Sequence, residues 1–243
     1  MSPRPGRQDS LESAHASKAT GAKSGRKDAA EPGGKKTKST TASIVELVVI
    51  IAVALGLALG IQAFVIKPYR IPSGSMEPTL IEGQRVLVNR ISMNFSEPHI
   101  GGIYVFHPSA GAEQEQCGPI AHMVTPGGAA CAAPVPQEAS VTFIKRLVAG
   151  PGDEIYVKEG HVFRKAAGTS SFVAEKDAYI EACGSSPECN FPDPIRIPSG
   201  HWFMMGDNRG NSDDSRYWGP VPTGWIIGQA VATYWPPDRI GIL

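Results

Sequence analysis

Residues 44–66 read IVELVVIIAVALGLALGIQAFVI, and this stretch decides how the rest of the chain is organised. Only Glu46 and Gln62 interrupt the apolar run, and both lie near its ends. A helix rises about 1.5 Å per residue, so a run of this length spans roughly the ~30 Å hydrocarbon core of a bilayer. We therefore predict a single transmembrane anchor over residues 44–66.

Two other interpretations of this run are a buried core helix and a cleaved secretory signal. A core helix normally keeps a polar face, and residues 47–61 have none. A cleavage site requires small residues directly after the apolar run, where residues 62–66 include Gln, Phe, Val and Ile. The leader of 43 residues is also far longer than that of a secretory signal. These features favour a retained anchor.

The charges on the two sides of the anchor differ in sign. Residues 1–43 contain nine Lys/Arg and four Asp/Glu, and the remaining residues contain 14 and 19. The first segment has almost no large apolar side chains, so we predict a disordered tail. Because basic residues concentrate before the anchor, the tail is expected in the cytosol and residues 67–243 on the extracytoplasmic side of the cell membrane. A basic tail on an acidic body argues against a nucleic-acid-binding fold.

The pattern of residues 67–243 predicts a mainly β domain, either a barrel or packed sheets with irregular loops. Long helical periodicity is absent, and Gly/Pro clusters separate short strand-like runs. Two stretches, about 108–140 and 165–199, have the composition of inserted loops. The predicted strands are Arg85–Asn89, Ile103–Phe106, Val141–Val148, Glu154–Val157, His161–Arg164, His201–Met205 and Trp225–Tyr234.

All four cysteines lie in the two inserted stretches, on the side of the membrane where disulfides form. Four cysteines allow three pairings, of which proximity in sequence favours Cys117–Cys131 with Cys183–Cys189. Zinc binding is the alternative. The spacings match no common zinc motif and no His lies suitably close, so no metal site is predicted.

Two segments carry candidate catalytic groups. In IPSGSMEPTL, residues 71–80, a rigid turn presents Ser75 within a few residues of the anchor, although such a serine is often merely structural. A nucleophilic serine needs a base. Lys145 lies in the apolar run VTFIKRLVAGPGD, residues 141–153, and burial there would lower its pKa enough to leave a neutral amine. The alternative is a solvent-facing lysine on an edge strand.

The third segment is MMGDNRGNSDDSRYWGPVP, residues 204–222. It could be an ordinary hydrophilic loop. However, aromatic and Met side chains flank its polar residues, and polar groups held between such flanks are usually buried and hydrogen-bonded to one another. The pattern therefore favours a network that orients a catalytic side chain.

These three segments, in this order and after an anchor, resemble bacterial type I signal peptidases, membrane-anchored Ser/Lys proteases that remove signal peptides. The resemblance extends from Ile44 to Pro237 and omits the tail and the two insertions. It implies a signal-peptidase-like β-barrel or sheet domain, no cofactor, and substrates that are exported preproteins with A-x-A sites.

The same resemblance implies roles for individual residues. Ser75 corresponds to the nucleophile and Lys145 to the general base. The hydroxyl of Ser73 and the backbone amide of Ser75 correspond to the oxyanion hole. Ser212 corresponds to a hydroxyl that orients the lysine, with Asp214 and Arg216 as a supporting ion pair. Shallow pockets for the alanines at positions minus one and minus three are expected from Ile71, Leu80, Phe143 and Ile144.

The chain departs from the family pattern at two positions. Gly102 stands where an Asp often precedes the strand, and Gly210 replaces the second Asp of GDNRDNS. Neither position belongs to the catalytic pair, but the second departure leaves open what neutralises Arg209.

Rival functions fit the sequence less well. A tethered binding module gives no reason for the polar density of residues 204–222. A penicillin-binding protein requires S-x-x-K, whereas Pro78 is the third residue after Ser75. A self-cleaving repressor would have a DNA-binding domain in place of the anchor.

Overall fold

A computed structural model describes residues 40–181 and 183–243. Its first element is the helix α1 (Thr40–Phe64), which begins four residues before the predicted anchor and ends two residues before its end. Among the described residues, one helix is long and apolar enough to cross a membrane, over Ser43–Ile61. Its large apolar side chains between residues 44 and 61 are more than half exposed, and a helix that is hydrophobic all round needs a protein core or a membrane to cover it. Residues 1–39 of the predicted disordered tail lie outside the described residues, and residues 40–43 belong to α1.

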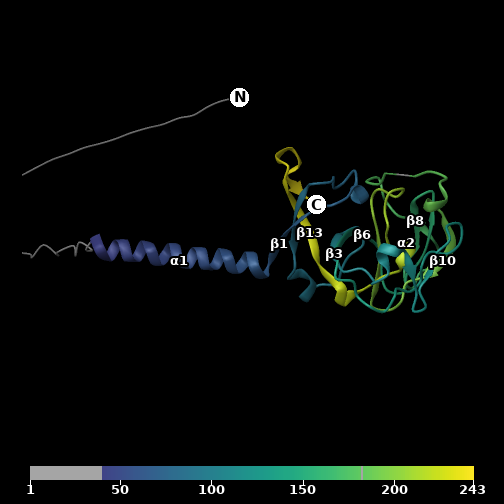
Figure 1. Ribbon diagram of the computed structural model, residues 1–243, viewed down its shortest axis with the longest axis horizontal. Helices are drawn as coiled ribbons and strands as arrows, with labels where there is room; N and C mark the ends of the chain where they lie inside the picture. Colours follow the sequence, from purple (N-terminus) through teal and green to yellow (C-terminus); the bar gives the residue numbers. More distant parts are fainter. Residues whose placement is uncertain (1–39, 182) are drawn as a thin grey trace, which may run out of the picture. The chain divides into compact units, whose positions relative to one another are not determined.

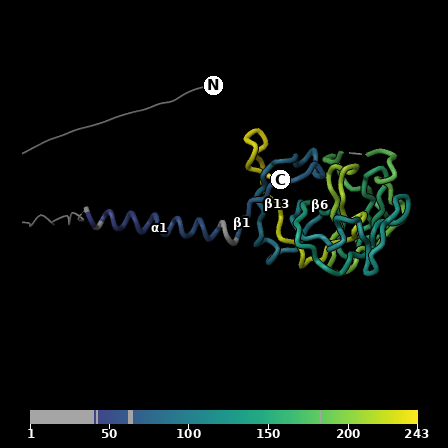
Figure 2. Tube along the Cα trace, viewed as in Figure 1, coloured from purple at the N-terminus to yellow at the C-terminus, as the bar shows by residue number. Residues whose placement is uncertain are grey.

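The body contains a large antiparallel sheet with strand order β1-β2-β13-β3-β6-β11-β12, and β14 pairs with β13. Figure 1 shows β13, β3 and β6 following one another across this sheet, and the trace in Figure 2 shows β13 between β1 and β6. The strands are β1 (Ile66–Arg70), β2 (Arg85–Asn89), β3 (Ile103–Phe106), β6 (Phe143–Ala149), β11 (His201–Met205), β12 (Val221–Pro222), β13 (Ile226–Trp235) and β14 (Gly241–Ile242).

Strand β3 lies at the centre of the sheet and is buried on both faces. Successive side chains of a strand point to opposite faces. Ile103 and Val105 therefore pack into one hydrophobic cluster, whereas Tyr104 and Phe106 pack into another. The neighbouring strand β6 shares this position, because its residues 143–146 pair with residues 103–106 in register. Polar side chains on β6 are thus placed deep in the body.

A second sheet has the order β10-β7-β8-β9, and a short pair β4-β5 lies in the first insertion. Tyr156 on β7 and Phe163 on β8 stack with ring centroids 4.8 Å apart. The region 165–199 was expected to be a loop, but part of it forms an edge strand of this sheet. The strands are β4 (Gln116–Cys117), β5 (His122–Met123), β7 (Glu154–Lys158), β8 (His161–Lys165), β9 (Val173–Ala174) and β10 (Phe191–Arg196).

Helical elements in the body are short. The only α-helix in its described part is α2 (Ser215–Trp218). Asp214 is its N-cap residue, and the Asp214 side chain accepts a hydrogen bond from the amide of Arg216. The 3-10 turns are η1 (Gly74–Met76), η2 (Ser92–Asn94), η3 (Ala112–Gln114), η4 (Pro187–Cys189), η5 (Thr223–Trp225) and η6 (Pro237–Arg239).

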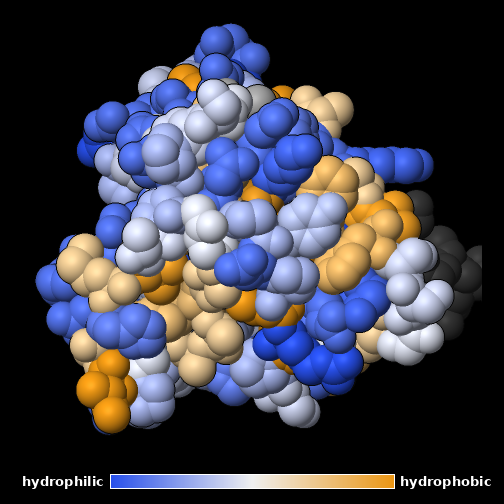
Figure 3. Space-filling model, turned by 90° about the vertical axis from the view of Figure 1, so that its right-hand side faces the viewer, coloured by the Kyte–Doolittle hydropathy of each residue, from blue (hydrophilic) through white to orange (hydrophobic). Residues whose placement is uncertain are grey.

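The structure confirms the main predictions for the body. All seven predicted strands are present, three with the predicted bounds and the others with ends that differ by one or two residues. The cysteines pair as Cys117–Cys131 and Cys183–Cys189, so each disulfide closes a loop within one inserted stretch. On the face drawn in Figure 3, apolar residues form separate patches between hydrophilic ones.

Candidate active site

Two side chains from distant parts of the sequence meet at the edge of a cleft. Ser75 lies in η1 and Lys145 lies on β6, and the Lys145 Nζ atom is 2.7 Å from the Ser75 Oγ atom. The two residues are 8% and 5% exposed. The structure therefore brings together the serine and the lysine that the sequence singled out.

The turn that carries Ser75 is fixed by the core beneath it. Met76 is fully buried in one cluster with Ile71 and Leu80, and its carbonyl accepts the amide of Leu80 at 2.9 Å. The carbonyl of Ser75 accepts the amide of Asn208 at 3.1 Å. Apolar anchors on one side and a backbone hydrogen bond on the other thus hold the serine toward the lysine.

Burial governs the charge of Lys145. Removal from water lowers the pKa of its ammonium group from 10.5 to about 8, although Asp214 and Asp213 partly oppose this change. Among the described residues, no carboxylate reaches ion-pair distance of its Nζ atom. A buried lysine without a contacting carboxylate is available as a neutral base near pH 8.

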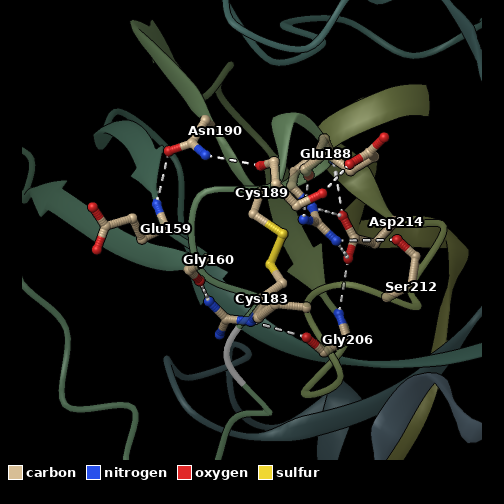
Figure 4. The surroundings of a disulfide bond; sticks show 12 residues. Glu159, Gly160, Cys183, Glu188, Cys189, Asn190, Gly206, Ser212 and Asp214 are labelled. Carbon is tan, nitrogen blue, oxygen red and sulfur yellow. Dashed lines mark hydrogen bonds and ion pairs between the residues drawn. A yellow bond between two sulfur atoms is a disulfide. The ribbon is translucent and has the colours of Figure 1, made fainter.

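The polar residues of the third segment form a buried network around Asp214 and Arg216. Both side chains are fully buried, and Arg216 donates from Nε and Nη2 to the two Asp214 carboxylate oxygens at 2.8 and 2.9 Å. Burial opposes ionisation of Asp214, but Arg216 overrides this and holds the pKa of Asp214 below its ordinary value. The same carboxylate accepts the amide of Gly206 at 3.0 Å, an interaction visible in Figure 4.

Ser212 lies between this network and the cleft. Arg216 Nη2 donates to its carbonyl at 3.0 Å, and the residue is 7% exposed. Its Oγ atom is buried without a hydrogen-bond partner, so it makes no hydrogen bond to Lys145. Both residues nevertheless line the same cleft.

A second buried ion pair was missed by the sequence reasoning. Arg146, beside Lys145 on β6, donates from Nε and Nη2 to the two carboxylate oxygens of Asp207 at 2.8 and 2.7 Å. Its guanidinium lies 3.9 Å from the centroid of the Tyr179 ring, and Thr79 donates to Asp207 at 2.5 Å. The strand period does place Arg146 on the face opposite Lys145, but only the fold provides its partner 61 residues away.

The cleft beside the Ser75–Lys145 pair has a volume of about 590 Å³. Besides Ser75, Lys145 and Ser212, the predicted site residues Ser73, Phe143 and Ile144 line it. The Ser73 Oγ atom lies 3.4 Å from the Ser75 Oγ atom. Ile71 lines an adjacent pocket of about 70 Å³ together with Phe143 and Ile144. Leu80 is instead fully buried in the core cluster.

Acidic side chains from the insertions also reach the cleft. Glu115 and Glu188 line it with Asp213, and none of the three was singled out from the sequence as a site residue. Burial, with Asp214 and Glu115 nearby, raises the pKa of Asp213 to about 7. Within the described ranges 40–181 and 183–243, no group of three or more His, Cys, Asp or Glu side chains is arranged to hold a metal ion.

Comparison with known proteins identifies the family. Residues 44–235 match the family described as "Signal peptidase, peptidase S26". The chain belongs to this signal peptidase family. It is 36% identical to a probable signal peptidase I-1 of Synechocystis, over 82% of this chain and 87% of that protein. It is 34% identical to signal peptidase I of Leptolyngbya laminosa, over 82% of this chain and 84% of that protein. The chain is therefore a serine peptidase, a hydrolase that cleaves signal peptides.

The departure of this signal peptidase at Gly102 has a steric explanation. A Cβ atom there would lie 2.7 Å from the Tyr104 ring and 3.1 Å from the His99 ring. Tyr104 is fully buried and its hydroxyl is 3.1 Å from His99 Nδ1. The two rings therefore occupy the space that a larger side chain at residue 102 would need.

Proposed function

We propose that the chain is a membrane-bound endopeptidase that cleaves exported preproteins after A-x-A sites by a Ser75/Lys145 acyl-enzyme mechanism. One observation carries this proposal. Burial lowers the pKa of Lys145 to about 8, and its Nζ atom lies 2.7 Å from a serine hydroxyl at the edge of a cleft in a signal peptidase.

The proposed reaction is acyl transfer. Neutral Lys145 takes the hydroxyl proton of Ser75 as the serine oxygen attacks the scissile carbonyl. The resulting ammonium returns that proton to the departing amine as the peptide bond breaks, which leaves the signal peptide esterified to Ser75. Lysine then activates a water molecule, which hydrolyses the ester and frees the serine. No cofactor takes part in these steps.

The oxyanion of each tetrahedral intermediate is proposed to accept the Ser75 amide and the Ser73 hydroxyl. The position of the Ser73 Oγ atom 3.4 Å from the nucleophile supports this role. Each such donor typically lowers the barrier by ~3–4 kcal/mol. Ser212, whose buried Oγ lacks a partner, is proposed to orient Lys145 during the cycle, supported by the Asp214–Arg216 pair.

Size exclusion is the proposed basis of the A-x-A preference. The pocket of about 70 Å³ beside the cleft admits a small side chain, and Ile71, Phe143 and Ile144 form its apolar walls. Larger residues at the minus-one and minus-three positions would need these walls to move. Leu80 is proposed to support Ile71 from within the core rather than to touch substrate.

The helix α1 is proposed to span the cell membrane once, with its basic tail in the cytosol and residues 67–243 outside. The charge difference across the helix and its length support this orientation. An anchored protease meets membrane-inserted preproteins in two dimensions, which raises their effective concentration.

The test is cleavage of a preprotein with an A-x-A site by the full chain in detergent, with the product amino terminus sequenced. We expect cleavage after A-x-A by the native protein and none by Ser75→Ala or Lys145→Ala. Robust cleavage by Lys145→Ala would place the base elsewhere. Absence of cleavage by the native protein in every lipid condition would favour a non-catalytic binding module.

A further inference from the structure

Arg209 is a buried cation, and two of its side-chain partners, Gly160 and Asp177, lie outside the three catalytic segments. Its side chain is fully buried, and its Nε and Nη1 atoms donate to the carbonyls of Gly206 and Gly160. Its Nη2 atom has no hydrogen-bond partner within residues 40–181 and 183–243. Among the described residues, the carboxylate within ion-pair distance is that of Asp177, 3.9 Å from Nη1.

Asp177 belongs to the second inserted stretch, which contacts residues 207–210 of the third segment. The amide of Glu181 donates to the carbonyl of Asp207 at 2.8 Å, and its own carbonyl accepts the amide of Arg209 at 3.1 Å. Cys183 lies against Gly210, where an added Cβ atom would be 2.9 Å from the Cβ of the cysteine. Figure 4 shows the Cys183–Cys189 disulfide beside Gly160, with Gly206 and Asp214 nearby. This insertion therefore packs where residue 210 lacks a side chain and supplies a carboxylate to Arg209.

The Gly206 peptide connects this arrangement to the nucleophile. Its N–H donates to Asp214 at 3.0 Å and its carbonyl accepts from Arg209 at 3.0 Å, so a buried charge holds each end. Its missing side chain leaves room for two close neighbours, because an added Cβ atom would clash with the Ser75 carbonyl and with Ser212 Oγ. A shift of the Gly206 backbone toward either neighbour would therefore displace Ser75 or Ser212.

We propose that Asp177 is a positioning residue for catalysis, which acts through Arg209 on the Gly206 peptide and thereby on Ser75. The inference rests on the proposed role of Ser75 as nucleophile. It assigns the second insertion a part in catalysis, because this segment provides the carboxylate within ion-pair distance of Arg209, which adds to the longer-range attraction of Asp214.

The chemistry depends on the charge of Asp177. A buried cation that loses its partner is left uncompensated, and its surroundings rearrange or admit water. Asn at position 177 keeps the shape and the contact with His161 but removes the charge. The guanidinium of Arg209 is then free to turn away from the Gly206 carbonyl.

The test measures kcat and KM for a preprotein with the full chain in detergent. Asp177→Asn is expected to lower kcat about tenfold or more with little change in KM, because small misplacements of reacting groups have such effects. Asp177→Glu should restore much of kcat. Asp193→Asn, an exposed change in the same insertion, should leave both constants unchanged. A native kcat in Asp177→Asn would overturn the inference.

A double-mutant cycle separates this pathway from a general loss of structure. Arg209→Gln and the double variant Asp177→Asn/Arg209→Gln should have the same kcat within about twofold, because the two residues act as one unit. Independent, multiplying losses would overturn the proposal. The double variant buries no unpaired charge, so it should fold even where Asp177→Asn alone does not. In that case a native kcat in the double variant would overturn the proposal.

Ser75→Ala, assayed in parallel, distinguishes the two possible failures. Residual cleavage by Ser75→Ala would overturn the proposed function itself. Complete loss in Ser75→Ala together with native activity in Asp177→Asn would overturn only the role of Asp177.

Discussion

The Ser75–Lys145 pair and the Asp214–Arg216 network bury cations in opposite ways. Lys145 contacts a neutral hydroxyl, and burial lowers its pKa to about 8. Arg216, equally buried, meets a carboxylate through two parallel hydrogen bonds and stays charged. Lys145 can therefore lose its proton near pH 8, whereas the pairing keeps both Asp214 and Arg216 charged.

The difference matches the two proposed roles: Lys145 exchanges a proton with substrate, and the ion pairs hold the backbone around it. A general base must lose and regain a proton in every cycle, so a contacting carboxylate on Lys145 would raise its pKa and weaken it. Residues that hold a backbone in place must not titrate in the working range. The Arg146–Asp207 pair, on the face of β6 opposite Lys145, follows the second pattern. Four predictions test the contrast.

The largest expected effect is on the stability of the fold, when the Asp214–Arg216 pair is broken. Asp214→Ala leaves the buried Arg216 guanidinium without its carboxylate and should destabilise the fold by about 3–5 kcal/mol, with loss of activity. Chemical denaturation in detergent, with cleavage measured alongside, checks this. The matched control is Arg196→Ala, whose exposed ion pair with Glu154 is screened by water and should contribute little to stability. Equal effects of the two changes would contradict the contrast.

Lys145→Met should have the opposite effect on stability while abolishing cleavage. The folded-state pKa of Lys145 is lowered, so the unfolded chain binds this proton more tightly and folding is penalised fully below pH 8. Methionine removes the penalty and should stabilise the protein by about 3 kcal/mol at pH 7. The gain should vanish as the pH rises through 10.5, the ordinary value. Thermal unfolding of the native protein and of Lys145→Met is measured at pH 7 and at pH 10.5. An equal unfolding temperature of the two proteins at pH 7 would refute the prediction.

The rate of the native protein should follow the titration of Lys145. Because the neutral amine is the proposed active form, kcat/KM should rise by about tenfold per pH unit below the pKa and level off above about pH 8. Initial rates across this range give the midpoint, with unfolding followed at each pH as the control. A flat or falling profile would exclude Lys145 as the base.

The smallest expected effect concerns Asp213. Its negative charge raises the pKa of Lys145, so Asp213→Asn should move the midpoint of the pH–rate profile to lower pH. The plateau above the midpoint should stay near that of the native protein. Asp193→Asn is the control, since it removes an exposed carboxylate outside the cleft. A midpoint that moves to higher pH would contradict this electrostatic coupling.

The two unpredicted strands that are longer than two residues share a physical cause. Both β1 and β10 are edge strands, and both contain proline: IKPYR and FPDPIR. Proline removes a ladder hydrogen bond and interrupts the alternating pattern, yet an edge strand tolerates it. Local pattern therefore identified the central strands and missed those that only pairing defines.

Site prediction divided in a similar way. Ser75 and Lys145 were identified because each lies in a distinctive local setting, and the structure places them in contact. Arg146 and Asp177 were not identified as site residues. Each lies beside a charged partner far away in sequence, Asp207 for Arg146 and Arg209 for Asp177.

The sequence by itself determined the apolar run long enough to cross a bilayer, the β character of the body, the three polar segments and the pairing of cysteines by proximity. These are properties of composition and short-range pattern. Only the tertiary structure decided which charges are buried, which are paired and how the second insertion reaches Arg209. Burial and pairing depend on contacts between residues tens of positions apart, and the same contacts set the pKa of Lys145.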